Sequence, residues 1–161
     1  MSQINFRPIG VIRSPFSELQ GMPIQPVGAR GVAGSIEIFE EFRPGLEDLE
    51  GFSHIFAIYH LHRCAGYSLQ VEPFLDSKPH GVFATRSPRR PNSIGLSVLE
   101  LTGVENGVIR IANVDILDNT PVLDIKPYVP KFDVWQAERI GWFAGKAEGA
   151  ETCRADARFA S

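Results

Sequence analysis

The chain has few cysteines and no long hydrophobic run. Its two cysteines, Cys64 and Cys153, lie far apart, one in an apolar run and one in a polar tail, so no disulfide framework is expected. No stretch approaches the ~18 apolar residues of a membrane span, and the first residues lack the apolar core of a secretory signal. These absences predict a cytoplasmic protein with no membrane partner.

The chain also lacks an excess of positive charge. Its formal net charge is −3 and its pI is near 5.8, which argues against a general nucleic-acid binder, because phosphate binding needs clustered Lys and Arg. The charge is nevertheless uneven, since residues 63–90 hold only two acids, Glu72 and Asp76. The basic residues of this stretch are Arg63, Lys78, His80, Arg86, Arg89 and Arg90. Such a face predicts at most weak, salt-dependent docking of a folded RNA, and charge alone leaves tRNA open as a partner.

No G-x-G-x-x-G motif and no regular alternation of strands with helices is present, so a Rossmann cofactor site has no support. Apolar or alternating runs predict strands at residues 6–13, 35–39, 52–61, 80–85, 94–104, 108–116 and 122–125. Asn106-Gly107 favours a tight hairpin between two of them. The pattern therefore predicts an all-β fold with minor helix, built as an antiparallel barrel or sandwich.

The remaining segments set the domain organisation. Residues 17–35 are rich in Gly and Pro and form a long loop, and loops of this length are usually functional or mobile. Residues 44–51 predict a helical turn closed by glycine, and residues 134–143 carry a weak helical pattern. We expect one domain at residues 1–143, followed by a tail at 144–161 that is frayed or lies on a partner.

A loop at residues 85–97 combines arginines with prolines. Pro88 and Pro91 restrict the backbone, so the guanidinium groups of Arg86, Arg89 and Arg90 are offered from a stiff loop. A carboxylate or phosphate then finds preset donors at little ordering cost. The alternative is a solvated basic turn, which is common on protein surfaces.

A second polar cluster follows the predicted hairpin. Asp118-Asn119-Thr120-Pro121 is typical of a turn, because Asp starts turns and Asn tolerates left-handed backbone. If the following strand is regular, Asp124, Lys126 and Tyr128 point to one face and suit ligand binding. The simpler interpretation is an ion pair between Asp124 and Lys126.

His60, His62 and Cys64 alternate along one predicted strand, so their side chains share a face and could ligate zinc or copper. At ~3.3 Å per residue the three span ~13 Å, which is too far for one ion without outside ligands. We therefore expect no metal site, and buried, hydrogen-bonded histidines instead.

Four segments resemble the TsaA-like family, also called TrmO-like, in that family's order and over about residues 6–135. They are Arg86-Ser-Pro-Arg-Arg-Pro-Asn-Ser-Ile-Gly-Leu-Ser97, Ile9-Gly-Val-Ile-Arg-Ser-Pro-Phe16, Leu49-Glu-Gly-Phe-Ser-His-Ile55 and Asp115-Ile-Leu-Asp-Asn-Thr-Pro-Val-Leu-Asp-Ile-Lys-Pro-Tyr128. The resemblance implies a single antiparallel β-barrel and an S-adenosyl-L-methionine-dependent methyltransferase. The expected acceptor is N6 of N6-threonylcarbamoyladenosine beside the tRNA anticodon, and the expected assembly is a homodimer in which Trp135 and Trp142 help to bury the interface.

The resemblance also implies a set of cofactor contacts. They map onto Pro23, Ile24, Gln25, His62, Arg63, Arg86, Leu96, Leu117, Asp118, Asn119 and Thr120. Three positions depart from the family's pattern: Asn119 replaces glycine, Ile24 replaces a basic residue and Ser93 replaces proline. Arg89, Arg90, Asn92 and Lys126 are the expected substrate-binding residues.

The residues leave the proton acceptor and the acceptor substrate open. Asp118, Asp124 and Tyr128 are the candidate catalytic groups, because methylation of N6 releases a proton. Two other functions remain: a methyltransferase of a small molecule, which the acidic pI favours, and a non-enzymatic adenosyl-ligand or metal-binding barrel.

Overall fold

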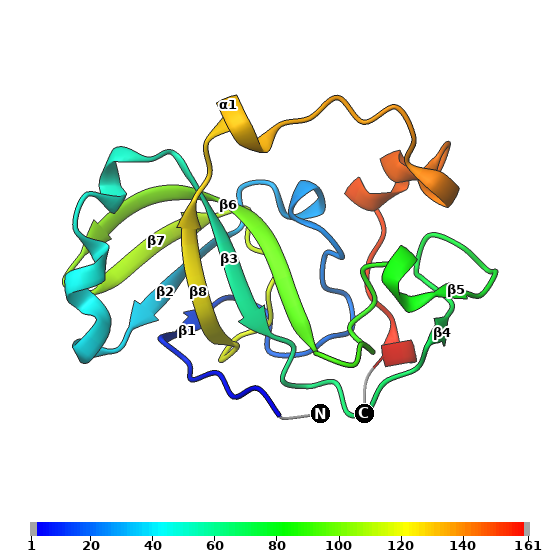
Figure 1. The fold of residues 1–161 in the computed structure, drawn as a ribbon, viewed down its shortest axis with the longest axis horizontal. Helices are drawn as coiled ribbons and strands as arrows, with labels where there is room; N and C mark the ends of the chain where they lie inside the picture. The colour runs from blue at the N-terminus through cyan, green and yellow to red at the C-terminus, as the bar shows by residue number, and fades with distance from the viewer. Residues whose placement is uncertain (1–2, 160–161) are drawn as a thin grey trace.

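The computed structural model describes residues 3–159, and its main element is a closed six-stranded antiparallel barrel (Figure 1). The barrel strands lie in the order β1-β2-β7-β6-β3-β8, and pairing of β1 with β8 closes it. Their bounds are β1 Gly10–Arg13, β2 Ala33–Ile38, β3 His54–His60, β6 Ile94–Glu105, β7 Val108–Ala112 and β8 Pro121–Pro127. The predicted all-β fold and barrel are confirmed.

The barrel interior explains why these residues form strands. Ile12, Ile36, Ile55, Leu99 and Ile109 are all fully buried and pack together in one cluster. They come from five different strands, and in each strand the buried residues alternate with more exposed ones. The period-2 apolar pattern therefore specifies which face of each strand turns inward.

The β6–β7 hairpin is the element that local sequence predicts best. Asn106 and Gly107 have φ angles of 53° and 81°, the left-handed values that a tight two-residue turn requires. The turn joins two strands that pair from Glu105↔Val108 to Glu100↔Ala112.

Outside the barrel the structure consists of short elements. β4 (Gln70–Val71) pairs only with β5 (His80–Gly81), and the single α-helix of the described residues, α1, spans Pro130–Asp133. The 3₁₀ helices are η1 Pro26–Ala29, η2 Glu40–Leu46, η3 Leu49–Gly51, η4 Val82–Ala84, η5 Gly141–Phe143, η6 Ala147–Glu151 and η7 Ala157–Phe159. None of the helices in the described part of the chain is long and apolar enough to cross a bilayer.

Two of these segments form a layer against one end of the barrel, which we call the cover (Figure 1). It comprises residues 62–93, with β4, β5 and η4, and the C-terminal segment at residues 141–159. Val71, Val82 and Phe159 make a small apolar cluster that joins the two segments.

The C-terminal segment is not frayed, in contrast to the expectation. The amide N–H of Ala155 donates to the Met22 carbonyl at 2.8 Å, and that of Gly21 donates to the Ala155 carbonyl at 2.8 Å. Ala150 is buried, and Arg30 pairs with Glu151. The segment therefore packs on its own chain, against the loop at residues 17–32.

Two local predictions are wrong. The predicted strand at 80–85 ends at Gly81, because the Thr85 N–H and hydroxyl both turn back to the Val82 carbonyl and close a 3₁₀ turn. The predicted helix at 134–143 does not form: α1 begins at Pro130 and ends at Asp133, and Gly141 has a left-handed φ of 58° that an α-helix cannot contain.

Candidate functional site

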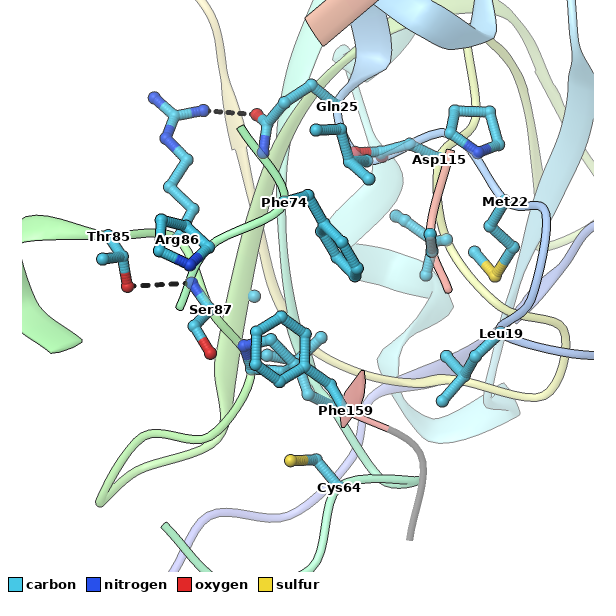
Figure 2. A pocket seen from close by; sticks show the side chains of 18 of the residues that line it. Leu19, Met22, Gln25, Cys64, Phe74, Thr85, Arg86, Ser87, Asp115 and Phe159 are labelled. Atoms are coloured by element: carbon cyan, nitrogen blue, oxygen red, sulfur yellow. Dashed lines mark hydrogen bonds between the residues drawn. The ribbon is translucent and has the colours of Figure 1, made fainter. Parts of the chain in front are cut away.

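A cavity of about 680 Å³ lies between the barrel end and the cover, a size typical of small-molecule sites (Figure 2). The barrel contributes Tyr59 at the end of β3, Gly95 at the start of β6 and Asp115 between β7 and β8. The opposite walls come from the loop at 17–32, the loop at 85–97 and the C-terminal segment. Phe74 and Phe159 are among the side chains that line it in Figure 2.

The arginine loop (residues 85–97) is stiffened by hydrogen bonds as well as by its prolines. The Ser87 N–H donates to Thr85 Oγ1 at 3.2 Å, and the Arg89 N–H donates to Ser87 Oγ at 3.3 Å. Arg90 Nη1 lies 3.2, 2.8 and 3.3 Å from the carbonyl oxygens of Val82, Thr85 and Ser87. The Arg90 guanidinium is thus used to hold the loop.

Arg86 connects the arginine loop to the loop at residues 17–32, which we call the first loop. Its Nη1 donates to Gln25 Oε1 at 2.6 Å, and the side chain is exposed (Figure 2). A guanidinium carries five N–H donors, so this bond leaves others for a carboxylate.

The bend at residues 117–120 is held to the end of β1. Asp118 Oδ1 accepts from the Ser14 N–H at 3.1 Å, Asp118 Oδ2 accepts from Asn119 Nδ2 at 2.7 Å, and Arg13 Nη1 donates to Asn119 Oδ1. Asn119 has a φ of 62°, a left-handed value that asparagine adopts more readily than most residues. Leu117 and Thr120 line the cavity, whereas Asp118 and Asn119 do not.

His62 lies on the cavity wall beside this bend. Its Nδ1 is 3.4 Å from Thr120 Oγ1. Burial, together with the charges of Arg63 and His60, lowers the pKa of His62 below its ordinary value. The ring is therefore neutral at physiological pH and contributes a polar contact without a charge.

Asp115 is a cavity residue that the sequence reasoning missed. Ser97 Oγ donates to Asp115 Oδ1 at 2.8 Å, and the Tyr59 hydroxyl lies 3.0 Å from Ser97 Oγ. Burial raises the pKa of Asp115 to about 6 and also raises the pKa of Tyr59. An aspartate between two apolar residues, Val114 and Ile116, is the signal that could have found it.

Gly95 makes room for this arrangement. A Cβ at Gly95 would lie 2.1 Å from the Tyr59 ring, so only glycine lets that ring lie against β6. The hydroxyl of Tyr59 then reaches Ser97 across the β3–β6 pair.

The cavity brings together nine of the eleven predicted cofactor contacts. These are Pro23, Ile24, Gln25, His62, Arg63, Arg86, Leu96, Leu117 and Thr120. Of the predicted substrate-binding residues, Arg90 lines the cavity, whereas Arg89, Asn92 and Lys126 do not.

The three predicted catalytic groups lie outside the cavity lining. Asp124 Oδ2 pairs with Lys126 Nζ at 2.9 Å, and both side chains are about half exposed, which matches the ion-pair interpretation. Tyr128 packs edge-on against the rings of His54 and Phe56.

The idea that His60, His62 and Cys64 share one strand is wrong. β3 ends at His60, and His62 and Cys64 follow in a turn, so the three do not alternate on one face. Within residues 3–159, no group of three or more His, Cys, Asp or Glu side chains is arranged to hold a metal ion.

Trp142, which is expected from the sequence at a dimer interface, is half-buried and contacts its own chain. Its Nε1 donates to the Ala84 carbonyl at 2.7 Å, and its indole stacks on His80 with 4.6 Å between ring centroids. Trp142 thus fastens the C-terminal segment to η4 and lines the cavity. Trp135 remains 85% exposed.

Known proteins resemble both the sequence and the fold. A protein of Pyrococcus abyssi, named "Probable S-adenosyl-L-methionine-binding protein", is 52% identical over 98% of this chain and 86% of its own length. The human tRNA (adenine(37)-N6)-methyltransferase is 38% identical over 78% of this chain, which corresponds to only 30% of the human protein.

The solved structures include TrmO from Pseudomonas aeruginosa, at 40% identity and a TM-score of 0.74 over 88% of this chain and 62% of that one. The relatives' names agree with S-adenosyl-L-methionine as the predicted cofactor. A family model described as the tRNA-methyltransferase O N-terminal domain matches residues 11–134. Because that match spans most of the barrel and the cavity, the chain belongs to the tRNA-methyltransferase O family.

Proposed function

We propose that this chain uses S-adenosyl-L-methionine to methylate N6 of the adenine beside the tRNA anticodon, in its N6-threonylcarbamoyl form. One observation carries the proposal: the arginine loop, the first loop and the 117–120 bend meet at a single cavity. The human and mouse relatives, named tRNA (adenine(37)-N6)-methyltransferases, support the acceptor.

The residues of the cavity fit this cofactor chemically. A guanidinium at Arg86 suits the carboxylate of the amino-acid end, and the apolar side chains of Leu96, Leu117 and Phe74 suit the adenosine. Backbone groups of the 117–120 bend can bond the ribose or the adenine edge. When bound, the cofactor would supply an electrophilic methyl group on its sulfonium sulfur, and the sulfur would leave as a neutral thioether.

The chain's own contribution to the reaction is positioning and exclusion of water. Methyl transfer needs donor and acceptor in line, so a rigid wall is worth more than an added base. Arg90 provides that rigidity by holding the arginine loop, and Phe74 and Phe159 provide apolar cover against water. Neutral His62 adds a polar contact beside Thr120.

The tRNA and a second copy of the chain are the partners in this proposal. The formal net charge of −3 means that tRNA must be held by a local basic surface, of which Arg63 and Arg89 are parts. A homodimer would combine two such surfaces, and exposed Trp135 and Phe132 (85% and 65%) are apolar side chains available to its interface.

The test is a methylation assay with the purified chain and two tRNA substrates that differ only in the threonylcarbamoyl group. We expect methyl incorporation into the modified tRNA and little into the unmodified one, with the product identified as an N6-methyl nucleoside by mass spectrometry. Cofactor binding without methylation of either tRNA would contradict the proposed acceptor.

The second candidate is a small-molecule acceptor, and the acidic pI near 5.8 is the observation that favours it. In the same assay it predicts that the chain binds the cofactor, leaves both tRNAs unmethylated and methylates a low-molecular-weight fraction instead.

A further inference from the structure

The Asp115 carboxylate lines the cavity without an ion-pair partner among the described residues. Among residues 3–159, no Lys, Arg or His side chain forms an ion pair with Asp115. The positive charge of Arg86 lowers the pKa of Asp115 slightly, but the Arg86 side chain bonds Gln25. Buried charges in proteins are ordinarily paired, so an unpaired one in a ligand cavity points to a partner that the ligand brings.

The geometry leaves one oxygen of this carboxylate for that partner. Asp115 Oδ1 accepts the Ser97 hydroxyl proton at 2.8 Å, whereas Oδ2 receives no donor from the described side chains. Because the Ser97 proton points to Asp115, Ser97 Oγ accepts from the Tyr59 hydroxyl, and the two hydroxyls form a chain that ends on the carboxylate. Hydrogen bonds of this direction favour the ionised form.

The raised pKa of Asp115 shows that these bonds do not offset the cost of burial. The carboxyl titrates at about 6, well above its ordinary 3.8. A cation placed beside Oδ2 would recover that cost by Coulombic attraction in a cavity where water screens little. A cation without a proton to donate needs negative potential alone. The Asp115 carboxylate offers it, because the hydrogen bonds that it accepts come from Ser97 and from its own backbone and neither brings a charge.

We propose that Asp115 is the counter-ion of the sulfonium and makes this cavity prefer the charged methyl donor over the neutral thioether product. The inference rests on the proposed cofactor. S-adenosyl-L-methionine and S-adenosyl-L-homocysteine share the carboxylate, the ammonium and the adenosine, so only the sulfonium distinguishes them. Asp115 would thus act in specificity and product release.

The test measures the affinities of both compounds by calorimetry, with no acceptor present. We expect the wild-type chain to bind the donor at least tenfold more tightly than the product. Asp115→Asn, which keeps the shape and removes the charge, should weaken donor binding about tenfold or more and change product binding less than twofold. Glu105→Gln is the matched control, because that carboxylate lies outside the cavity and is paired with Arg110.

A pH titration of the wild-type chain tests the same inference without a variant. The preference for the donor should fall between pH 7.5 and pH 5 as Asp115 takes up a proton, and Asp115→Asn should show no such fall. Of the ionisable groups around Asp115, Tyr59 stays protonated across this range because burial raises its pKa, and Asp115→Asn separates the titration of Asp115 from that of His62, whose pKa burial lowers.

Two results would overturn the inference. If Asp115→Asn weakened the binding of both compounds equally, the carboxylate would contact the ammonium or the ribose that they share. Unchanged binding of both, with loss of methylation alone, would make Asp115 a proton acceptor. If the wild-type chain bound neither compound, the proposed function itself would be contradicted.

Discussion

The barrel and the cover are held together by different interactions. The barrel is a closed ladder of backbone hydrogen bonds around fully buried Ile, Leu and Val side chains. The cover has only a two-residue strand pair and a small apolar cluster. Its segments are held together largely by side chains that donate hydrogen bonds to backbone carbonyls. Arg90, Trp142 and Arg158 each donate to cover carbonyls in this way.

This difference explains where the cavity lies. Closed strands cannot open without losing many hydrogen bonds at once, whereas the cover can move by breaking a few. A site between the two has a floor that is part of the barrel and a wall that is held in place by a few side-chain hydrogen bonds, among them those of Arg90. The comparison predicts that changes in the barrel core reduce global stability most, whereas changes in the cover have smaller effects on stability and act on the cavity wall.

The largest effect is expected in the barrel core. Leu99→Ala removes a fully buried side chain and should lower the free energy of unfolding by about 3 kcal/mol. Val82→Ala in the cover, also buried, should cost only about 2 kcal/mol, because its cluster is small and can collapse. Urea unfolding of both variants measures the difference, and a greater loss for Val82→Ala would contradict the comparison.

At the floor of the cavity, Asp115→Asn should stabilise the ligand-free chain. Because the folded pKa of about 6 exceeds the ordinary 3.8, the ionised carboxylate disfavours folding above pH 6, and this penalty disappears below about pH 4. The gain at pH 7 should be about 2 kcal/mol, reduced by water in the cavity. Thermal unfolding of the variant and the wild type from pH 4 to pH 8 measures it, and a pH-independent difference would contradict the assignment.

In the cover, Arg90→Ala should loosen the arginine loop with a smaller global effect. The lost charge-assisted bonds to Val82, Thr85 and Ser87 should cost about 1.5 kcal/mol. Amide exchange should accelerate in residues 82–97 and remain unchanged in β7. Faster exchange throughout the barrel would show that the cover is part of the same cooperative unit.

The smallest effect is expected at the contact between the two cover segments. Asp76 accepts from Lys146 at 2.6 Å and from His80 at 3.0 Å, and the Lys146 bond is the main cause that holds its pKa below its ordinary value. Its contribution is therefore present above about pH 4 and is lost as the pH falls further. Asp76→Asn should speed amide exchange in residues 141–151 at pH 7, whereas Glu138→Gln, an exposed control, should not.

The barrel could be predicted from the sequence because its strands follow local rules. Alternating apolar residues and the Asn106-Gly107 turn specify faces and register within a few neighbouring residues. The cover could not, because its conformation depends on contacts between distant segments. Trp142 is half-buried by contacts that include Ala84 and His80, about 60 residues away in the chain, and the C-terminal segment packs on both the loop at 17–32 and residues 71–84.

The site divides in the same way. The family resemblance located Arg86, His62 and Leu117, which the structure brings to one cavity. It named Asp118 and did not consider Asp115, since a turn motif is visible in sequence, whereas the bond of Asp118 to the Ser14 backbone is not. Whether Asp115 faces a core or a cavity depends on its contacts with Ser97 and, through Ser97, with Tyr59. These two residues lie on β6 and β3, which pair only after folding.

The most direct test of the whole account is calorimetry of S-adenosyl-L-methionine with the wild-type chain, Arg86→Ala and Arg110→Ala. Arg110 lies on β7, which contributes no residue to the cavity, and it carries the same charge. We predict one cofactor bound per chain, a ten- to hundredfold loss of affinity for Arg86→Ala, and no change for Arg110→Ala. Equal affinities for all three proteins, or no binding at millimolar cofactor, would contradict the claim that this cavity holds the methyl donor.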